Sequence, residues 1–140
     1  MVAIPKYVDI NVFVYWLGAH PQFGEESLKW VEDMETGPRK KYVTSALTLY
    51  ELLLVISSLT GKSLKDAEFA GEVVYALISL KGLAIEPLKS RDALQAPSLM
   101  KKHGLDYEDS LHLATALRVG AGEIVSNDGD FDKTSLKRTF

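Results

Sequence analysis

The stretch from Leu105 to Phe131 reads LDYEDSLHLATALRVGAGEIVSNDGDF, and it decides the fold class. Residues 106–119 carry small and apolar side chains at helical spacing, and Gly120 and Gly122 follow as a stop signal. Glu123 to Ser126 then form a short β-like run. A helix that leads at once into a strand is a unit of a parallel α/β sheet, so this stretch predicts that fold class.

The same alternation of short β-like runs and longer helical patterns continues through the rest of the chain. Strands are expected at residues 6–10, 41–45, 83–86, 123–126 and, as a short edge strand, 136–140. Helices are expected at residues 13–17, 23–34, 48–60, 64–78, 90–103 and 106–119. The predicted architecture is an α/β three-layer sandwich, in which helices flank a central, mostly parallel sheet of four or five strands.

Two positions set helix boundaries in this scheme. Pro97 lies inside residues 90–103, where a proline removes a backbone donor and clashes with the preceding turn. We therefore expect a break there, with Pro97 as the first residue of a second helix. Ser63 is expected to cap the helix of residues 64–78, and Gly82 to stop it. The expected inward face of that helix consists of Leu64, Ala67, Ala70, Val74, Leu77 and Ile78.

Length and composition are those of one ordinary globular unit. The chain has 140 residues, of which 46% are hydrophobic and 25% charged, so a single domain over residues 1–140 is expected. No apolar run reaches the roughly 18 residues that span a bilayer, and the opening MVAIPKYVDI has no long apolar segment. We therefore expect a soluble, cytoplasmic protein without membrane contact. The absence of cysteine excludes disulfides and thiolate metal sites, and the net charge of −3 argues against tight non-specific duplex binding.

Four acidic residues lie at the ends of expected strands or in the helices that follow them. Asp9 ends the first strand, and Glu51 lies in the first turn of the helix after the second strand. Asp109 lies in the first turn of the helix at residues 106–119, and Asp128 directly follows the fourth strand. Ligands of open parallel sheets bind at the carboxyl ends of the strands. The sequence therefore predicts that these four carboxylates share one site.

Carboxylates held together without cations repel one another, and burial raises their pKa values. A divalent ion reverses that cost, and carboxylate oxygens suit Mg²⁺ or Mn²⁺. Such a site is typical of phosphodiester hydrolysis. The alternative for any single acid is a helix cap, which is the role expected of Asp106. Capping explains Glu51 poorly, because apolar residues surround it in the sequence and a lone buried carboxylate is costly.

Three blocks, occurring in this order, resemble the PIN domain, the ribonuclease fold of VapC-type toxins. They are YVDINVFVYWL at residues 7–17, TLYELL at residues 48–53 and LDYEDSLHLATALRVGAGEIVSNDGDF at residues 105–131. The third block is the most specific, because an Asp followed by a small residue, Leu-His and Ala-Thr-Ala is a familiar pattern of that family. The resemblance extends from Lys6 nearly to the end of the chain.

The resemblance implies that the catalytic acids are Asp9, Glu51, Asp109 and Asp128, with Asp130 as a further candidate for the fourth position. Among these, Asp9 and Asp109 would be the direct ligands of Mg²⁺ or Mn²⁺.

Two polar residues would support the acids. Ser126 stands where the family usually has a threonine, so its hydroxyl is expected to orient an acid or a water. Asn11, two residues after Asp9, is expected to hydrogen-bond that carboxylate.

The function that the resemblance implies is a metal-dependent endoribonuclease acting on single-stranded RNA, the toxin of a toxin–antitoxin pair. Toxins of this family usually form homodimers, and a cognate antitoxin reaches the acidic site with its C-terminal segment. An RNA-processing nuclease is equally compatible with the residues, and a non-catalytic PIN-like interaction module would not need all four acids. A haloacid-dehalogenase-type phosphatase would need a second aspartate where Asn11 stands, and a phosphoreceiver domain would need a lysine near Ser126 and Asp128.

A few other side chains leave alternatives open. His112 follows Asp109 by three residues, so it is either a general base or a packed histidine. Lys133 and Arg118 are candidates for phosphate contacts near the site. The aromatic residues of the N-terminal third would either stack on RNA bases or pack in a core or dimer; they are Tyr15, Trp16, Phe23 and Trp30.

Overall fold

The computed structural model describes residues 3–140 and places five parallel strands in one sheet, in the order β3-β2-β1-β4-β5. The strands are β1 (Lys6–Val8), β2 (Tyr42–Ser45), β3 (Leu83–Glu86), β4 (Glu123–Val125) and β5 (Lys137–Thr139). The connecting helices are α1 (Ile10–Leu17), α2 (Gly24–Thr36), α3 (Ala46–Thr60), α4 (Ala67–Ile78), α5 (Ser90–His103), α6 (Tyr107–Arg118) and the 3₁₀ helix η1 (Gly129–Lys133). The predicted fold class is confirmed.

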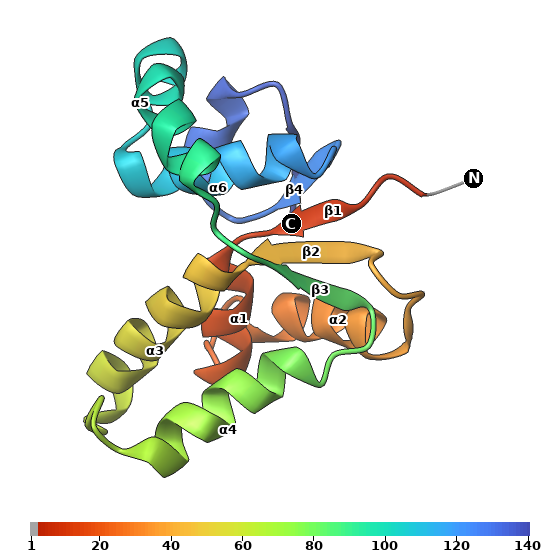
Figure 1. The fold of residues 1–140 in the computed structure, drawn as a ribbon. Helices are drawn as coiled ribbons and strands as arrows, with labels where there is room; N and C mark the ends of the chain where they lie inside the picture. The colour runs from red at the N-terminus through yellow and green to blue at the C-terminus, as the bar shows by residue number, and fades with distance from the viewer. Residues whose placement is uncertain (1–2) are drawn as a thin grey trace.

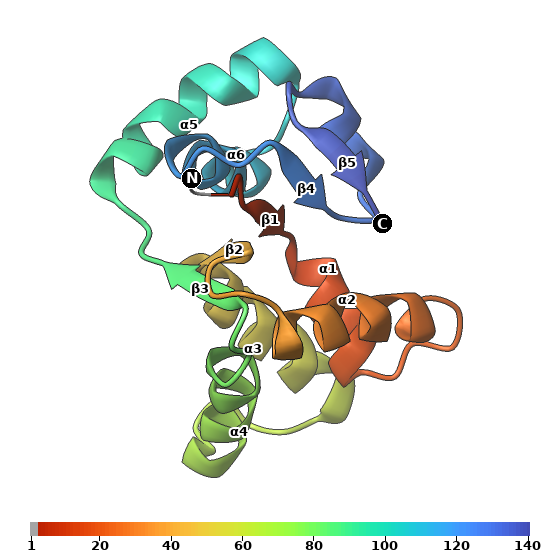
Figure 2. The same cartoon turned by 90° about the vertical axis from the view of Figure 1, so that its right-hand side faces the viewer.

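Helices cover both faces of the sheet, and Figures 1 and 2 show α1 to α4 on one side and α5 and α6 on the other. Successive strand residues point to opposite faces, so Tyr7 joins the core beneath α6 while Val8 joins the core formed with α1 to α4. Both side chains are fully buried, as a strand at the centre of a three-layer sandwich requires. None of the helices within residues 3–140 is both long and apolar enough to cross a bilayer.

The first strand ends earlier than the sequence predicts, because Asp9 caps a helix. Its carboxylate accepts a hydrogen bond from the Ile10 amide at 2.8 Å, and α1 begins at Ile10 instead of residue 13. The short link places Asp9 at the exact junction between β1 and α1. The position of this side chain is therefore fixed by both elements.

The helix expected at residues 64–78 also begins at a different cap. Asp66 accepts a hydrogen bond from the Phe69 amide and starts α4, whereas Ser63 accepts one from Lys65 within the preceding turn. The inward face shifts accordingly, because Phe69, Val73 and Leu77 are the buried residues of α4. The predicted cap was therefore wrong, and so was most of the predicted face, because the helix packs on Phe69 and Val73 and only Leu77 of the predicted residues is buried.

The expected break at Pro97 is also wrong, because α5 continues through this residue. A proline in a helix leaves the carbonyl four residues earlier without its amide donor, and here that carbonyl belongs to Ala93. The Tyr107 hydroxyl donates a hydrogen bond to the Ala93 carbonyl at 3.3 Å. A side chain from the first turn of α6 thus replaces the missing backbone donor, and the exposed ring of Pro97 meets solvent.

Pro97→Ala restores the backbone donor in an exposed helix interior. Alanine is about 3 kcal/mol better than proline there, and proline's smaller unfolded-state entropy offsets about 1 kcal/mol. We expect a gain of about 2 kcal/mol in the free energy of unfolding, measured by urea denaturation. Ser98→Ala, at the next exposed position of α5, serves as the control and should change stability by less than about 0.5 kcal/mol. A Pro97→Ala protein no more stable than this control would contradict the account.

The order of the strands creates a topological switch point at the carboxyl edge of the sheet. The chain passes from β1 to β2 and β3 on one side and then returns to place β4 and β5 on the other side of β1. The connections that leave β1 and β4 therefore diverge, and an open parallel sheet binds its ligands at such a point. Asp9 follows β1 and Asp128 lies shortly after β4, so both acids stand beside this switch point.

Candidate active site

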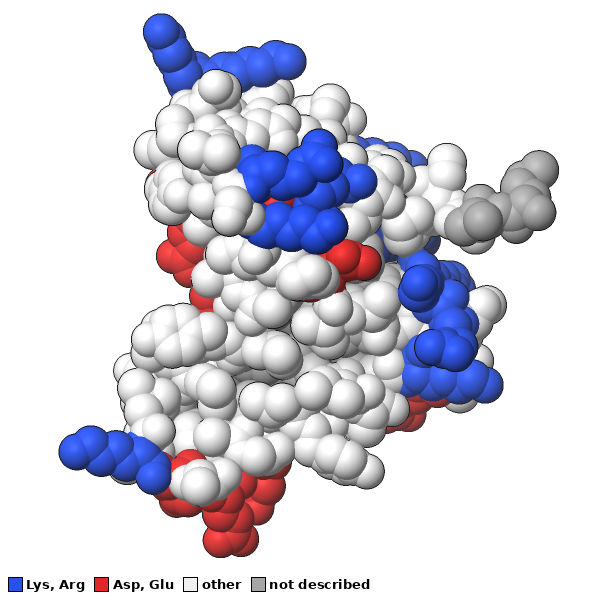
Figure 3. All heavy atoms as spheres, in the orientation of Figure 1, with Lys and Arg blue, Asp and Glu red and all other residues white. Residues whose placement is uncertain are grey.

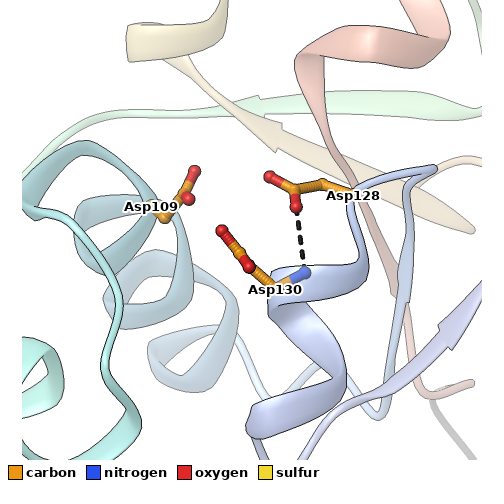
Figure 4. Close-up of side chains that lie close together, drawn as sticks. All are labelled: Asp109, Asp128 and Asp130. Carbon is orange, nitrogen blue, oxygen red and sulfur yellow. Dashed lines mark hydrogen bonds between the residues drawn. The ribbon is translucent and has the colours of Figure 1, made fainter.

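Three carboxylates gather beside the switch point. Asp109, Asp128 and Asp130 each offer an oxygen atom that lies within 4.8 Å of the other two. Figure 4 shows Asp109 on α6 pointing toward the two other side chains, which come from the segment after β4 and from η1. The Asp128 carboxylate accepts a hydrogen bond from the Asp130 amide at 2.9 Å, so it also caps η1. The sequence left open whether Asp128 or Asp130 completes the site, and the structure places both beside Asp109.

Asp9 is buried at the same edge of the sheet, with 3% of its surface exposed. Polar groups surround its carboxylate. The Ser126 hydroxyl donates to Asp9 Oδ2 at 2.7 Å, and the Asn11 amide donates to the same oxygen at 3.2 Å. Ser126 also accepts a hydrogen bond from the Asp128 amide at 3.0 Å. The serine hydroxyl therefore connects the acid that follows β1 to the backbone that carries Asp128, and Ser126 and Asn11 contact Asp9 as the sequence predicts.

Glu51 is 7% exposed, and its carboxylate contacts the buried side chain of His112. Its Oε1 atom lies 2.5 Å from His112 Nε2, and His112 Nδ1 lies 2.6 Å from the Tyr7 hydroxyl. His112 itself is 1% exposed. Of the two interpretations left open for this residue, the packed histidine is confirmed, and its partner resolves the question of what balances the buried carboxylate of Glu51.

Burial and a surplus of negative charge both raise the pKa values of Asp9 and Asp109. Burial raises the pKa of Asp109 to about 7, with further contributions from Asp106, Asp9 and Asp128, against a smaller opposing effect of His112. Burial also raises the pKa of Asp9, although His112 and the Ser126 hydrogen bond act in the other direction. Burial disfavours the protonated form of His112, but the Glu51 hydrogen bond and nearby carboxylates outweigh it and raise the pKa of His112. A cation at Asp109 would relieve this surplus.

The expectation that Arg118 contacts phosphate was wrong. Arg118 is not free to bind phosphate, because its guanidinium donates to both carboxylate oxygens of Asp92, at 2.9 and 3.0 Å, and to the Pro87 carbonyl. Of the two interpretations of the aromatic residues, core packing holds for Trp16 and Trp30, which pack against the core, and the Trp30 ring lies edge-on against Tyr42. Lys133 keeps a half-exposed ammonium 3.5 Å from Asp130 and remains at the rim of the acids.

The residues of the site fit a hard divalent cation. Carboxylate oxygens from Asp109, Asp128 and Asp130 converge, and no soft ligand is among them. Asp9 does not belong to this group of three, so the expected ligand pair of Asp9 and Asp109 stays a prediction. Its charge nevertheless contributes to the raised pKa of Asp109, so the two carboxylates interact electrostatically.

The structure is thus an open parallel α/β domain in which carboxylates converge at the switch point of the sheet. The family model of the PIN domain matches residues 6–137, and the chain therefore belongs to the PIN domain family. This confirms the resemblance seen in the three sequence blocks. A comparison with curated protein sequences gave no match.

Solved structures share the fold at low sequence identity. The VapC20 toxin of Mycobacterium tuberculosis, which cleaves the sarcin–ricin loop, matches with a TM-score of 0.73 and 16% identity over 94% of this chain and 98% of that chain. A toxin–antitoxin complex from Klebsiella pneumoniae gives 0.65 and 16% over 90% and 89%. VapBC2 of Rickettsia felis, solved with a promoter DNA fragment, gives 0.63 and 20% over 97% and 98%.

Asp109→Asn should stabilise the metal-free protein in a pH-dependent way. The folded-state pKa of Asp109 is about 7, above the roughly 3.9 of an unfolded aspartate, so the folded protein retains a proton that the unfolded chain loses. The stability of the wild type therefore falls as pH rises between these values. The asparagine variant lacks this loss and should be more stable by about 1–2 kcal/mol at pH 8 in chelator, less than the full shift implies because Asp109 is partly exposed.

The measurement is urea denaturation of both proteins in chelator at pH 4.5 and pH 8. The stability difference should shrink toward zero at the lower pH. Glu108→Gln, an exposed neighbour in the same first turn of α6, is the matched control and should show no such gain. Equal stability of wild type and Asp109→Asn at pH 8 would mean that burial and the neighbouring carboxylates do not raise the pKa of Asp109.

Proposed function

We propose that this protein is a metal-dependent endoribonuclease that hydrolyses phosphodiester bonds of single-stranded RNA, and that it is the toxin of a toxin–antitoxin pair. The observation that carries the proposal is the convergence of Asp109, Asp128 and Asp130 beside Asp9 at the switch point of a PIN domain. The toxin structures that share its fold support the biological role.

The chain supplies the parts that such a reaction needs. Asp109, Asp128 and Asp130, with Asp9 behind them, would hold Mg²⁺ or Mn²⁺. When bound, the ion would lower the pKa of a coordinated water and stabilise charge on the leaving oxygen. In the hydrolysis, a water oxygen bonds to phosphorus, the bond to the leaving oxygen breaks, and that oxygen takes up a proton. Asn11 and Ser126 keep Asp9 in place, since both donate hydrogen bonds to it.

The overall charge is compatible with an RNA substrate because contact can be local. The chain carries a net charge of −3, so long-range attraction to RNA is weak. Lys133 lies beside Asp130 with 52% of its side chain exposed, and its ammonium is the group that we expect to contact a phosphate next to the scissile bond. A bound divalent ion would reduce the negative charge of the site further.

Asp9→Asn and Asp109→Asn should each abolish Mg²⁺-dependent cleavage of single-stranded RNA while the fold remains intact. Each substitution keeps the size of the side chain and removes one negative charge from the cation site. The assay is cleavage of a fluorescent RNA in Mg²⁺ or Mn²⁺, compared with chelator, with circular dichroism as the test of folding. A loss of about 100-fold or more in rate is expected, as for other groups that stabilise transition-state charge.

Asp66→Asn is the matched control for these variants. Asp66 caps α4 away from the acidic cluster, and asparagine is an equally good N-cap. This variant should cleave RNA as the wild type does. Undiminished cleavage by both site variants would refute the nuclease assignment.

We also propose that the protein forms a homodimer and that a cognate antitoxin covers the acidic site. Figure 3 shows a broad uncharged surface over α3 and α4. Large apolar side chains stand exposed there, including Tyr50 and Leu54 of α3 and Tyr75 and Ile78 of α4. Large apolar side chains exposed on neighbouring helices favour a protein–protein interface. The acidic site itself would suit basic side chains of an antitoxin segment.

Tyr75→Glu combined with Ile78→Lys should convert the dimer to a monomer. These side chains are 72% and 58% exposed, so the substitutions should not disturb the core of the protomer. Light scattering after gel filtration should report twice the chain mass of 15.5 kDa for the wild type and one chain mass for the variant. Ile4→Lys, an exposed apolar residue before β1, is the control and should remain dimeric. A wild-type protein that is monomeric at micromolar concentration would exclude this dimer.

A further inference from the structure

His112 lies at a junction of the elements that deliver the acids. Its Nδ1 atom contacts the Tyr7 hydroxyl on β1 at 2.6 Å, and its Nε2 atom contacts Glu51 on α3 at 2.5 Å. Tyr7 lies two residues before Asp9, and His112 lies one helical turn after Asp109 in α6. One buried ring therefore connects the three elements that carry Asp9, Glu51 and Asp109.

We propose that His112 is a positioning residue of the nuclease site, which fixes the Glu51 carboxylate and the relative placement of β1, α3 and α6. The proposal rests on the proposed cation site for its binding readout and on the proposed nuclease activity for its kinetic readout. The imidazole would not touch RNA or a metal ion. Its role is to hold Glu51, and through the three elements Asp9 and Asp109, in the geometry that captures the cation.

The geometry excludes the other functional interpretation of this histidine. A general base needs a ring nitrogen within hydrogen-bond reach of the substrate or its water. His112 is 1% exposed, and both of its nitrogens are occupied by Tyr7 and Glu51. No nitrogen remains for a water or a ribose hydroxyl.

The hydrogen bond to His112 also compensates the buried carboxylate of Glu51. A buried carboxylate needs a hydrogen-bond partner. Glu51 Oε1 is bound by His112, and its Oε2 atom makes no hydrogen bond to the part of the chain that the structure describes. Without the histidine, this carboxylate would lose the one side-chain partner that the structure gives it within the described residues.

A double-mutant cycle tests the proposal through metal binding. His112→Gln keeps a side chain that can donate to Glu51 but removes the positive charge and the link to Tyr7. Glu51→Gln removes the carboxylate that the histidine holds. We expect His112→Gln to raise the Kd for Mn²⁺, measured by calorimetry, about 10- to 100-fold, the usual effect of losing an outer-sphere partner of a metal site.

The two substitutions should not be additive. If His112 acts through Glu51, the double variant should bind Mn²⁺ no more than about twofold more weakly than the weaker single variant. Fully multiplicative effects would overturn the proposal, and so would a Kd of His112→Gln within about twofold of the wild type. His20→Gln is the control, because His20 lies in the turn before α2, where its Nδ1 accepts hydrogen bonds from the Gln22 and Phe23 amides.

Kinetics and NMR separate positioning from simple loss of stability. His112→Gln should lower kcat for RNA about 10-fold or more and leave KM within about twofold, because no contact with RNA is lost. Tyr7→Phe, which removes only one hydroxyl, should show a smaller change in the same direction. The ring nitrogen shifts of the folded, metal-free wild type should report two hydrogen-bonded nitrogens, and Glu51→Gln should move the Nε2 shift selectively.

These readouts also distinguish the failure of this proposal from failure of the proposed function. A wild type that binds Mn²⁺ but cleaves no RNA would defeat the nuclease assignment, while the Mn²⁺ cycle and the ring shifts would still decide the role of His112. If His112→Gln does not fold, the nitrogen chemical shifts of the His112 ring in the wild type and in Glu51→Gln decide the role of His112. An Nε2 shift that is the same in both proteins would overturn the proposal.

Discussion

Five carboxylates lie at one edge of the sheet, and their mutual repulsion opposes folding whenever no cation is bound. Two unit charges 4 Å apart repel by about 4 kcal/mol at the effective dielectric constant near a protein surface, so several such pairs would be costly against a total stability of about 5–15 kcal/mol. The packing of the rest of the domain has to tolerate this cost. How each acid is compensated therefore explains much of the local structure around the site.

The compensation differs from acid to acid. Asp9 receives hydrogen bonds from the Ile10 amide, Asn11 and Ser126, and Glu51 is held by His112. Within residues 3–140, the Asp109 carboxylate receives no hydrogen bond, and burial raises its pKa to about 7. The protein itself thus compensates Asp9 and Glu51, while Asp109 is the acid that a bound cation would stabilise most.

Sheet topology decides where this charge gathers. Because all strand pairs are parallel, every strand ends at the same edge, and the helices that follow begin there. Asp9 caps α1 and Asp128 caps η1, while Asp106 caps α6 and so fixes the turn that carries Asp109. The capping and the functional interpretation of these acids are therefore compatible. A cap holds the backbone of the acid or its neighbour rigidly, and a carboxylate held in this way still has lone pairs for a ligand.

Much of the fold follows from local pattern, whereas the partners of the site depend on distant residues. The glycine stop after α6 and the short runs at β1 to β5 sufficed to predict the parallel sheet. The prediction failed at Pro97 because sequence rules count the lost amide but not the Tyr107 hydroxyl that replaces it. Asp128 and Asp9 were predictable as strand-end acids. The pairing of Glu51 with His112 joins residues 61 positions apart, and no periodicity encodes such a contact.

Because the site residues are far apart in the sequence, the site forms only when the whole domain folds. Asp9 follows β1, Glu51 lies in α3 and Asp109 lies in α6, so these side chains reach one edge of the sheet only when the sheet and both helical layers are assembled. A cation that binds the assembled site but not the unfolded chain stabilises the whole domain by an amount that grows with its concentration above Kd. If the site binds a cation as proposed, folding and cation binding are one coupled equilibrium, in which the charge that destabilises the free protein supplies the affinity that stabilises the loaded one.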